Sequence, residues 1–162
     1  MRIRSLLPSD RAQLIDILSQ GAGFRSEEVA CAIELLDAAL VPADGDNYEA
    51  LVAIDDQPGA LSERVLGYAC FGATPMTEGT YDLYWLAVAE GARGRGVGGA
   101  LFTAVAQELK QREARIIRVE TSSLEGQGGA RRFYEKVGFR LSGAIADFYR
   151  QGDDLLVFAK AL

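Results

Sequence analysis

The sequence predicts one domain of mixed α/β (α+β) class, with a mostly antiparallel sheet of six to seven strands and helices on both faces. The first observation is a series of apolar, strand-like segments in residues 48–88, joined by short connections that favour antiparallel neighbours. The second is a helical pattern between the segments 81–88 and 116–121, which predicts a central parallel β-α-β pair. The third is a pair of strands, 139–146 and 155–161, that ends the chain as a hairpin.

The first part of the chain predicts one strand and two helices. Residues 3–7 form the expected strand, and Pro8-Ser9-Asp10 then turns into a helix that ends near residues 21–23. A second helix is expected to begin at Ser26 as its N-cap, with acidic residues in its first turn, and to run to Leu40. The apolar residues on the expected buried faces are Leu14, Ile15 and Leu18 in the first helix and Val29, Ile33, Leu36 and Leu40 in the second.

Turn residues and apolar periodicity define the remaining elements. The expected strands are residues 48–54, 63–71, 81–88, 116–121, 139–146 and 155–161. The expected helices cover about 96–113 and 130–137, and Gly138 is expected to end the latter with a left-handed C-cap. No repeat, low-complexity tract or linker interrupts this order, so residues 1–162 are expected to form a single domain.

Composition excludes several classes of function. The chain has 162 residues, of which 49% are hydrophobic, and no apolar run approaches the roughly 18 residues of a membrane span. The first residues show no signal-peptide pattern, so we expect a cytoplasmic protein without a membrane partner. Cys31 and Cys70 are expected to be buried free thiols, and without any histidine they provide neither a disulfide framework nor a metal site. The absence of histidine also excludes a histidine base.

The charge distribution indicates an anionic ligand at one place. The net charge is −6, which argues against a nucleic-acid partner and is compatible with a cationic substrate. Basic side chains nevertheless gather in two short stretches of the C-terminal half, at Arg93, Arg95, Arg131, Arg132 and Lys136.

The stretch Arg93-Gly94-Arg95-Gly96-Val97-Gly98-Gly99 combines a glycine-rich turn with the start of a helix. The first N–H groups of a helix have no intrahelical partner, and the helix dipole adds positive charge there. Glycines let an anion approach the backbone, and the two arginines add charge-assisted donors. The stretch therefore predicts a phosphate or pyrophosphate site.

Two kinds of ligand are compatible with this stretch. Gly94, Gly96 and Gly99 satisfy the dinucleotide pattern G-x-G-x-x-G, and Glu120 lies near the position of a ribose-binding acid. Against it, residues 89–92 separate the turn from its strand, the pattern has no use for arginines, and too little chain follows for a second half-sheet. Parsed instead as Arg93-x-x-Gly96-x-Gly98, the stretch resembles the acetyl-CoA pyrophosphate loop of the GNAT N-acetyltransferases.

Two further segments carry the same resemblance, which covers nearly the whole chain. Leu86-Ala87-Val88 resembles the end of the family's fourth strand. Residues 130–139, Ala-Arg-Arg-Phe-Tyr-Glu-Lys-Val-Gly-Phe, resemble the second family signature, A-x-x-(F/L)-Y-x-x-x-G-F. Seven residues before the signature tyrosine the family usually has asparagine, whereas this chain has Gln127.

The resemblance implies a cofactor site and a proton donor. The strands around 81–88 and 116–121 are expected to splay apart, so that the pantetheine arm of acetyl-CoA pairs with the free edge of the first. The Val88 N–H would polarise the thioester carbonyl, and Tyr134 would protonate the departing thiolate. The implied cofactor-binding residues are Leu86, Ala87, Val88, Arg93, Gly94, Arg95, Gly96, Val97, Gly98, Gln127 and Arg132.

A base is also needed, because an ammonium group must lose a proton before it attacks. Asp82 and Glu120, on neighbouring strands, are the candidates, although either also fits a solvated strand end. Strict alternation along the strand puts Asp82, Tyr84 and Leu86 on one face and Tyr81, Leu83 and Trp85 on the other. Asp147 with Tyr149 is a weaker candidate for amine recognition.

The resemblance thus predicts an acetyl-CoA-dependent N-acetyltransferase that transfers its acetyl group directly to a primary amine in a ternary complex. The amine belongs to a small molecule or a peptide, and a homodimer is possible. The alternatives are a non-catalytic acyl-CoA-binding regulatory module and a dinucleotide-binding domain.

Overall fold

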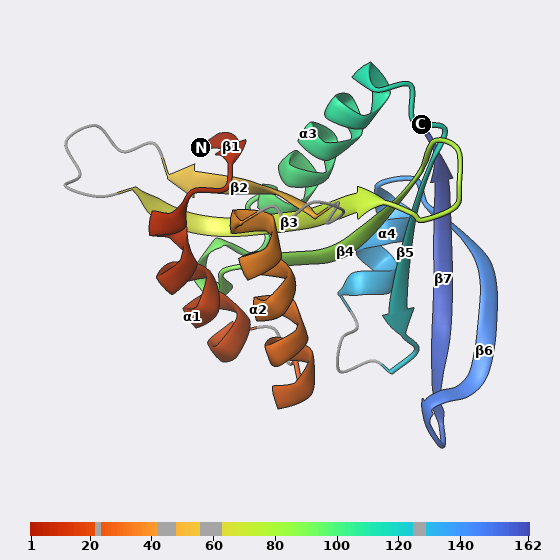
Figure 1. Cartoon of the computed structure of the whole chain (residues 1–162). Helices are drawn as coiled ribbons and strands as arrows, with labels where there is room; N and C mark the ends of the chain where they lie inside the picture. Colours follow the sequence, from red (N-terminus) through yellow and green to blue (C-terminus); the bar gives the residue numbers. More distant parts are fainter. Residues whose placement is uncertain (22–23, 42–47, 56–62, 125–128) are drawn as a thin grey trace.

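The computed structural model describes residues 1–21, 24–41, 48–55, 63–124 and 129–162. Within these ranges a single sheet has the strand order β1-β2-β3-β4-β5-β7-β6 (Figure 1). Its strands are β1 (Arg2–Ser5), β2 (Glu49–Asp55), β3 (Arg64–Ala73), β4 (Thr80–Val88), β5 (Ile116–Ser122), β6 (Arg140–Arg150) and β7 (Asp153–Ala161).

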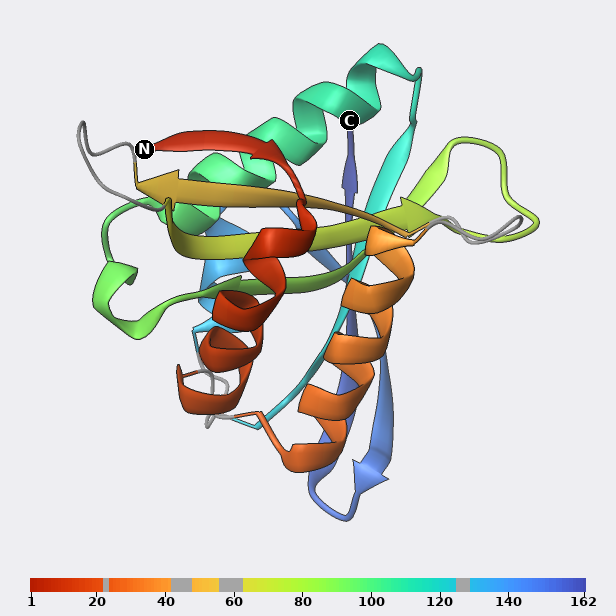
Figure 2. The same cartoon turned by 60° about the vertical axis from the view of Figure 1, so that its left-hand side comes forward.

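Four α-helices cover the described part of this sheet on both faces. They are α1 (Arg11–Gly21), α2 (Ser26–Leu40), α3 (Val97–Gln111) and α4 (Ala130–Lys136), and two short 3-10 turns, Pro8–Asp10 and Glu90–Ala92, precede α1 and α3. Figures 1 and 2 show α1 and α2 together on one face, with α3 and α4 on the other. Within the described ranges, no helix combines the length and apolar character that a membrane crossing requires.

Strand pairing confirms the predicted mixed sheet. Strands β1 to β4 form an antiparallel meander, and β7 pairs antiparallel with both β5 and β6. Strands β4 and β5 are parallel and are joined through α3, as the β-α-β pattern predicted. The element boundaries differ from those expected by a few residues at most, because apolar periodicity marks the buried faces and Gly138, at φ +93°, provides the expected left-handed C-cap.

Each face of the sheet has its own hydrophobic core. The core under α3 and α4 contains Leu66, Ala69, Phe71, Leu83, Leu101, Val105, Leu109, Tyr134 and Phe158. The core under α1 and α2 contains Leu14, Leu18, Ala32, Leu36, Val52, Ile54, Tyr68, Cys70 and Ala87.

A β-bulge in β4 overturns the alternation expected from the sequence. Opposite β3, Cys70 pairs with Trp85 and Phe71 pairs with Leu83, so Tyr84 is the extra residue. Asp82 and Tyr84 do share a face, but Trp85 also packs on the α1/α2 side and Leu86 on the α3/α4 side. The alternation therefore shifts by one residue in the half of β4 that approaches the glycine-rich stretch.

Two smaller expectations are also corrected. The N-cap of α2 is Arg25 rather than Ser26, because the Arg25 N–H donates to the Glu28 carboxylate at 2.7 Å and helical geometry begins at Ser26. Cys70 is buried as predicted, whereas Cys31 is exposed, because it lies on α2 outside the stripe that faces the core.

Candidate active site

A cleft of about 950 Å³ opens where β4 and β5 separate. The two strands pair at three positions, Thr80 with Ile116, Tyr81 with Ile117 and Asp82 with Arg118, and diverge beyond them (Figure 1). Past this point β4 pairs only with β3 and β5 only with β7, so the facing edges have no partner strand among the described residues. Unpaired strand edges require hydrogen-bond partners, which an extended ligand can provide.

The glycine-rich stretch forms one wall of this cleft and has the geometry that an anion site needs. Gly94 and Gly96 have φ values of +73° and +81°, in the left-handed region that favours glycine, and Gly96 is the N-cap of α3. The first intrahelical bond runs from the Ala100 N–H to the Gly96 carbonyl at 3.0 Å, which leaves the earlier N–H groups free of such bonds. No acidic side chain occupies the first turn of α3.

Gly98 is required for a different reason. A Cβ atom at this position would lie 3.3 Å from the Phe133 ring and 3.4 Å from the Leu86 side chain. The start of α3 therefore packs closely against both α4 and β4, so the helix start and the strand edge lie in one cleft.

The basic side chains are divided between the cleft and the surface. Arg93 lines the cleft, and its Nε donates to the Val88 carbonyl at 3.4 Å. Arg95 and Arg132 are exposed and do not line the cleft, whereas Lys136, one turn beyond Phe133 on α4, does. The predicted residue Gln127 lies outside the described residues.

The predicted strand edge is in place. Leu86, Ala87 and Val88 all line the cleft and pair on their other side with β3. A Cβ atom on Gly67 would lie 2.5 Å from the Ala87 carbonyl oxygen, so only glycine allows β3 to approach β4 this closely.

Tyr134 lines the same cleft from α4. Its side chain is only 7% exposed and packs against the rings of Phe133, Phe139 and Phe158. Burial raises the pKa of the Tyr134 phenol, so it stays protonated at neutral pH. Among the described residues no hydrogen bond occupies its hydroxyl group.

The structure separates the two predicted carboxylates. Asp82 does not share the cleft with Tyr84; it is buried, forms an ion pair with Arg118 and accepts a hydrogen bond from the Thr74 hydroxyl at 2.7 Å. Although Asp82 and Tyr84 lie on one face of β4, only Tyr84 therefore reaches the cleft, because Arg118 lies directly beside Asp82 in the parallel register and pairs with it. Glu120 does line the cleft, and its carboxylate lies 3.0 Å from Arg118 Nη1.

Sequence reasoning missed a third wall, which comes from α2 and the residues before it. Its cleft-lining residues are Phe24, Glu27, Glu28, Cys31 and Leu35. Their spacing of three or four residues was the available signal, because it marks a second helical stripe beside the one that faces the core. Tyr84, Trp85 and Tyr149 complete this side. Burial, followed by the charge of Asp82, raises the pKa of Tyr84 to about 12.

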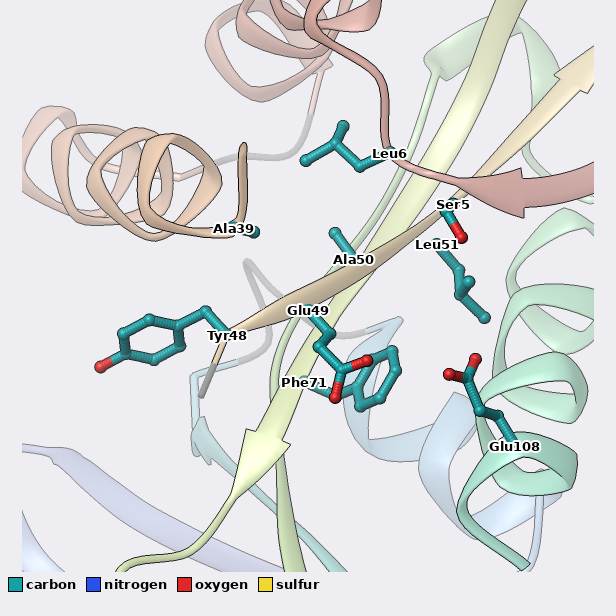
Figure 3. A pocket seen from close by; sticks show the side chains of 9 residues that line it. All are labelled: Ser5, Leu6, Ala39, Tyr48, Glu49, Ala50, Leu51, Phe71 and Glu108. Atoms are coloured by element: carbon teal, nitrogen blue, oxygen red, sulfur yellow. The ribbon is translucent and has the colours of Figure 1, made fainter. Parts of the chain in front are cut away.

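A second, smaller cavity of about 170 Å³ lies apart from these residues (Figure 3). It is bounded by the ends of β1 and α2, the start of β2 and α3. Its two carboxylates, Glu49 and Glu108, both pair with Arg112, with Glu49 Oε2 at 2.7 Å from Nη2. None of the predicted site residues lines it.

Comparison with known proteins agrees with this geometry. The sequence profile of the acetyltransferase (GNAT) domain family matches residues 46–141, more than half of the chain. No curated protein gives a significant match.

Solved structures share the fold over nearly the entire chain. A GNAT-family protein from Desulfovibrio desulfuricans, assigned as an acetyltransferase, is 35% identical with a TM-score of 0.89, over 99% of this chain and 98% of that chain. An aminoglycoside 6′-N-acetyltransferase solved with coenzyme A is 17% identical with a TM-score of 0.78, over 99% and 97% of the two chains. A ribosomal-protein-alanine N-acetyltransferase from Brucella melitensis is 23% identical with a TM-score of 0.73, over 100% of both chains. The profile match and the 35% identical structure agree with the diverging strands and the glycine-rich helix start, and they establish that this chain belongs to the GNAT acetyltransferase family.

Proposed function

We propose that the protein is an N-acetyltransferase that transfers the acetyl group of acetyl-CoA to a primary amine by direct attack in a ternary complex. One observation carries the proposal. A single cleft brings together the N-terminus of α3, the edge of β4 and the buried Tyr134. Among the described residues, this strand edge has no partner strand and the Tyr134 hydroxyl group has no hydrogen bond. These are the three contacts that an acyl-CoA needs in order to react.

The residues present fit acetyl-CoA. The amides of Gly94 and of residues 96–98, with Arg93 beside them, suit its pyrophosphate, and the edge of residues 86–88 suits its pantetheine arm. Lys136 lines the cleft from α4 and suits the phosphates, whereas the predicted residue Arg132 is exposed outside the cleft. When bound, acetyl-CoA supplies an acetyl group that is activated as a thioester.

Three groups of the chain carry out the proposed reaction: the Glu120 carboxylate, the Val88 N–H and the Tyr134 hydroxyl group. Glu120, acting through water, takes the proton that the ammonium group must lose before attack. As the C–N bond forms and the C–S bond breaks, the Val88 N–H stabilises the carbonyl oxygen and Tyr134 gives its phenolic proton to the departing sulfur. The nitrogen, which is positively charged after the attack, loses its second proton to solvent as the amide forms. The raised pKa of Tyr134 keeps this proton in place, and solvent restores it after release of coenzyme A.

Direct transfer is favoured over an acyl-enzyme route. Burial raises the pKa of the Cys70 thiol to about 12, so this cysteine is not a thiolate at neutral pH. Cys31 lines the cleft, but the chain has no histidine that would serve as its base.

The test is turnover of an amine panel with acetyl-CoA by the wild type and by Tyr134→Phe. Acetylated product is quantified by chromatography, since the exposed Cys31 thiol would react with thiol reagents. We expect Tyr134→Phe to lower kcat about a hundredfold, the usual range for a general acid, with coenzyme A affinity retained. Tyr81→Phe is the matched control, because Tyr81 packs on the same core outside the cleft.

Two outcomes would contradict the proposal. Full turnover by Tyr134→Phe would refute the proton-donor role. Tight binding of acetyl-CoA without turnover of any amine would instead favour the non-catalytic acyl-CoA-binding module.

A further inference from the structure

The cleft is lined by side chains of both charges. Its cationic lining residues are Arg93, beside the glycine-rich stretch, and Lys136, one turn along α4 from the Phe133 ring that contacts Gly98. Its anionic lining residues are Glu27, Glu28 and Glu120, which come from the first turn of α2 and from the end of β5. The pyrophosphate of the proposed donor fits the cationic residues beside the glycine-rich stretch, so the carboxylates are left for the acceptor.

Tyr149, near the end of β6, lines the cleft together with these carboxylates. Burial first, and then the charges of Glu120, Asp153 and Glu28, raise the pKa of this tyrosine. The first turn of α2, the end of β5 and Tyr149 therefore border the same space.

Of the three carboxylates, Glu27 is the one without an ion pair among the described residues. Glu28 accepts from the Arg25 N–H at 2.7 Å and pairs with the Arg25 guanidinium, and Glu120 pairs with Arg118. The Glu27 carboxylate instead accepts from the Ser26 hydroxyl at 3.3 Å. Its pKa is lowered, first by its own backbone N–H and then by that hydroxyl group, so it is ionised at neutral pH.

Aromatic rings lie beside this carboxylate. Phe24 and Trp85 both line the cleft and meet edge to face, with their centroids 5.2 Å apart. Tyr84 lines the same side. Aromatic faces next to a carboxylate favour an organic cation over an inorganic ion.

In the proposed mechanism the reaction takes place beside Tyr134, in the same cleft. Tyr134 is more than nine-tenths buried and directs a polar group without a described partner into the same space. It lies on α4, on the opposite side of the sheet from α2. An amine that reacts between Tyr134 and Glu120 therefore does not pair with the Glu27 carboxylate. A second positive charge on the acceptor would provide that pair.

We propose that the acceptor carries a second positive charge: one amino group attacks the thioester beside Glu120, and the other stays protonated against Glu27 and the Phe24–Trp85 wall. This inference rests on the proposed N-acetyltransferase function. A small diamine and a peptide N-terminus followed by a basic residue offer the same chemistry.

The test compares kcat/KM for matched acceptors with acetyl-CoA. The pairs are 1,5-diaminopentane against 1-aminopentane, and the dipeptide amide Ala-Lys against Ala-norleucine, which separates a small diamine from a basic peptide. We expect the dication to be preferred about tenfold in one pair, with the preference weakening as salt is raised.

The variant Glu27→Gln tests whether Glu27 is the carboxylate that binds the second positive charge of the acceptor. It should lower the dication preference about fivefold, mainly through KM. Glu34→Gln is the matched control, since Glu34 is exposed on the same helix and does not line the cleft, and it should keep the full preference. Calorimetric titration of the coenzyme A complex with 1,5-diaminopentane and with the Ala-Lys amide, for the wild type and both variants, gives the same comparison without turnover.

Equal kcat/KM values within both pairs, or a preference that Glu27→Gln and Glu34→Gln reduce alike, would overturn the inference while the enzyme remains active. Absence of turnover with every amine is a different result, because it removes the proposed function. In that case, failure of both dications to bind the coenzyme A complex would overturn the inference as well.

Discussion

Gly96→Glu is the sharpest test of the pyrophosphate site, because at this position the cost to folding is separate from the cost to binding. Gly96 has φ +81°, and a Cβ atom there would meet no atom within 4 Å. The folding cost is therefore backbone strain alone, about 1–2 kcal/mol for an L-residue in the left-handed region. For a domain of this size that lowers Tm by about 2–8 °C, and the variant stays folded.

The binding cost comes from charge. A carboxylate about 6 Å from a phosphate charge, at an effective dielectric constant near 20, is repelled by roughly 3 kcal/mol before salt screening. The new side chain also covers the N–H groups at the start of α3. We expect Kd for coenzyme A to rise at least about a hundredfold, measured by calorimetric titration. Gly96→Gln should give a smaller rise, because it adds the same bulk without the charge.

Gly152→Glu is the matched control. Gly152 has φ +79° and equally open space, but it lies in the turn between β6 and β7 and does not line the cleft. Its Tm should fall by a similar amount while its affinity for coenzyme A stays that of the wild type. A folded Gly96→Glu protein with wild-type affinity, or an equal loss of affinity in Gly152→Glu, would refute the assignment of this loop.

Two further predictions concern carboxylates outside the cleft. Asp82→Asn leaves Arg118 without its buried partner and should lower the free energy of unfolding, measured in urea, by about 1–3 kcal/mol. We expect no comparable loss of kcat. A large loss of kcat in the folded variant would instead show that Asp82 acts as a base. For Asp10, burial alone would raise the pKa, but hydrogen bonds from Arg4 and from the Leu7 N–H outweigh it, and the pKa of Asp10 is lowered. A lowered folded-state pKa contributes stability at pH values above the unfolded pKa, which is near 4, and this stability is lost as the pH falls through the folded pKa. Asp10→Asn should therefore be less stable than the wild type by about 2 kcal/mol at pH 7. This difference in the free energy of unfolding should disappear in acid. A gap that is the same at pH 3 and pH 7 would contradict this account.

Much of the fold could be predicted from the sequence because the spacing of apolar residues within each element marks the face that is buried. Leu101, Val105 and Leu109 recur every four residues and are all fully buried, so the pattern and the packing agree. Gly138 was equally predictable, because the residue after a helix end often adopts the left-handed conformation that favours glycine. The left-handed conformation of Gly96 was not predicted, because the N-cap of a helix is ordinarily extended.

The site was less predictable because it depends on contacts between distant segments. The sequence alone made Asp82 a candidate base, whereas the register of β4 and β5 places Arg118 beside it. The register of a parallel pair cannot be predicted from either strand alone. Glu27 and Cys31 were hidden for a related reason. A helix that packs on a sheet shows its core stripe strongly, whereas a stripe that faces a cleft mixes polar and apolar residues and resembles a surface.

The bulge at Tyr84 connects these observations, because it decides which ligand each residue of β4 can meet. Before the bulge, Tyr81 and Leu83 face α3 and α4; after it, Leu86 and Val88 face that side while Trp85 faces α1 and α2. Without the extra residue the alternation would continue unbroken, and Leu86 would turn away from Gly98 while Trp85 would point at the start of α3. The bulge thus presents small aliphatic side chains to the proposed donor and an aromatic side chain to the proposed acceptor. The bulge lies just beyond Asp82, the last residue of β4 that pairs with β5. The change in side-chain direction therefore occurs where the two strands begin to separate.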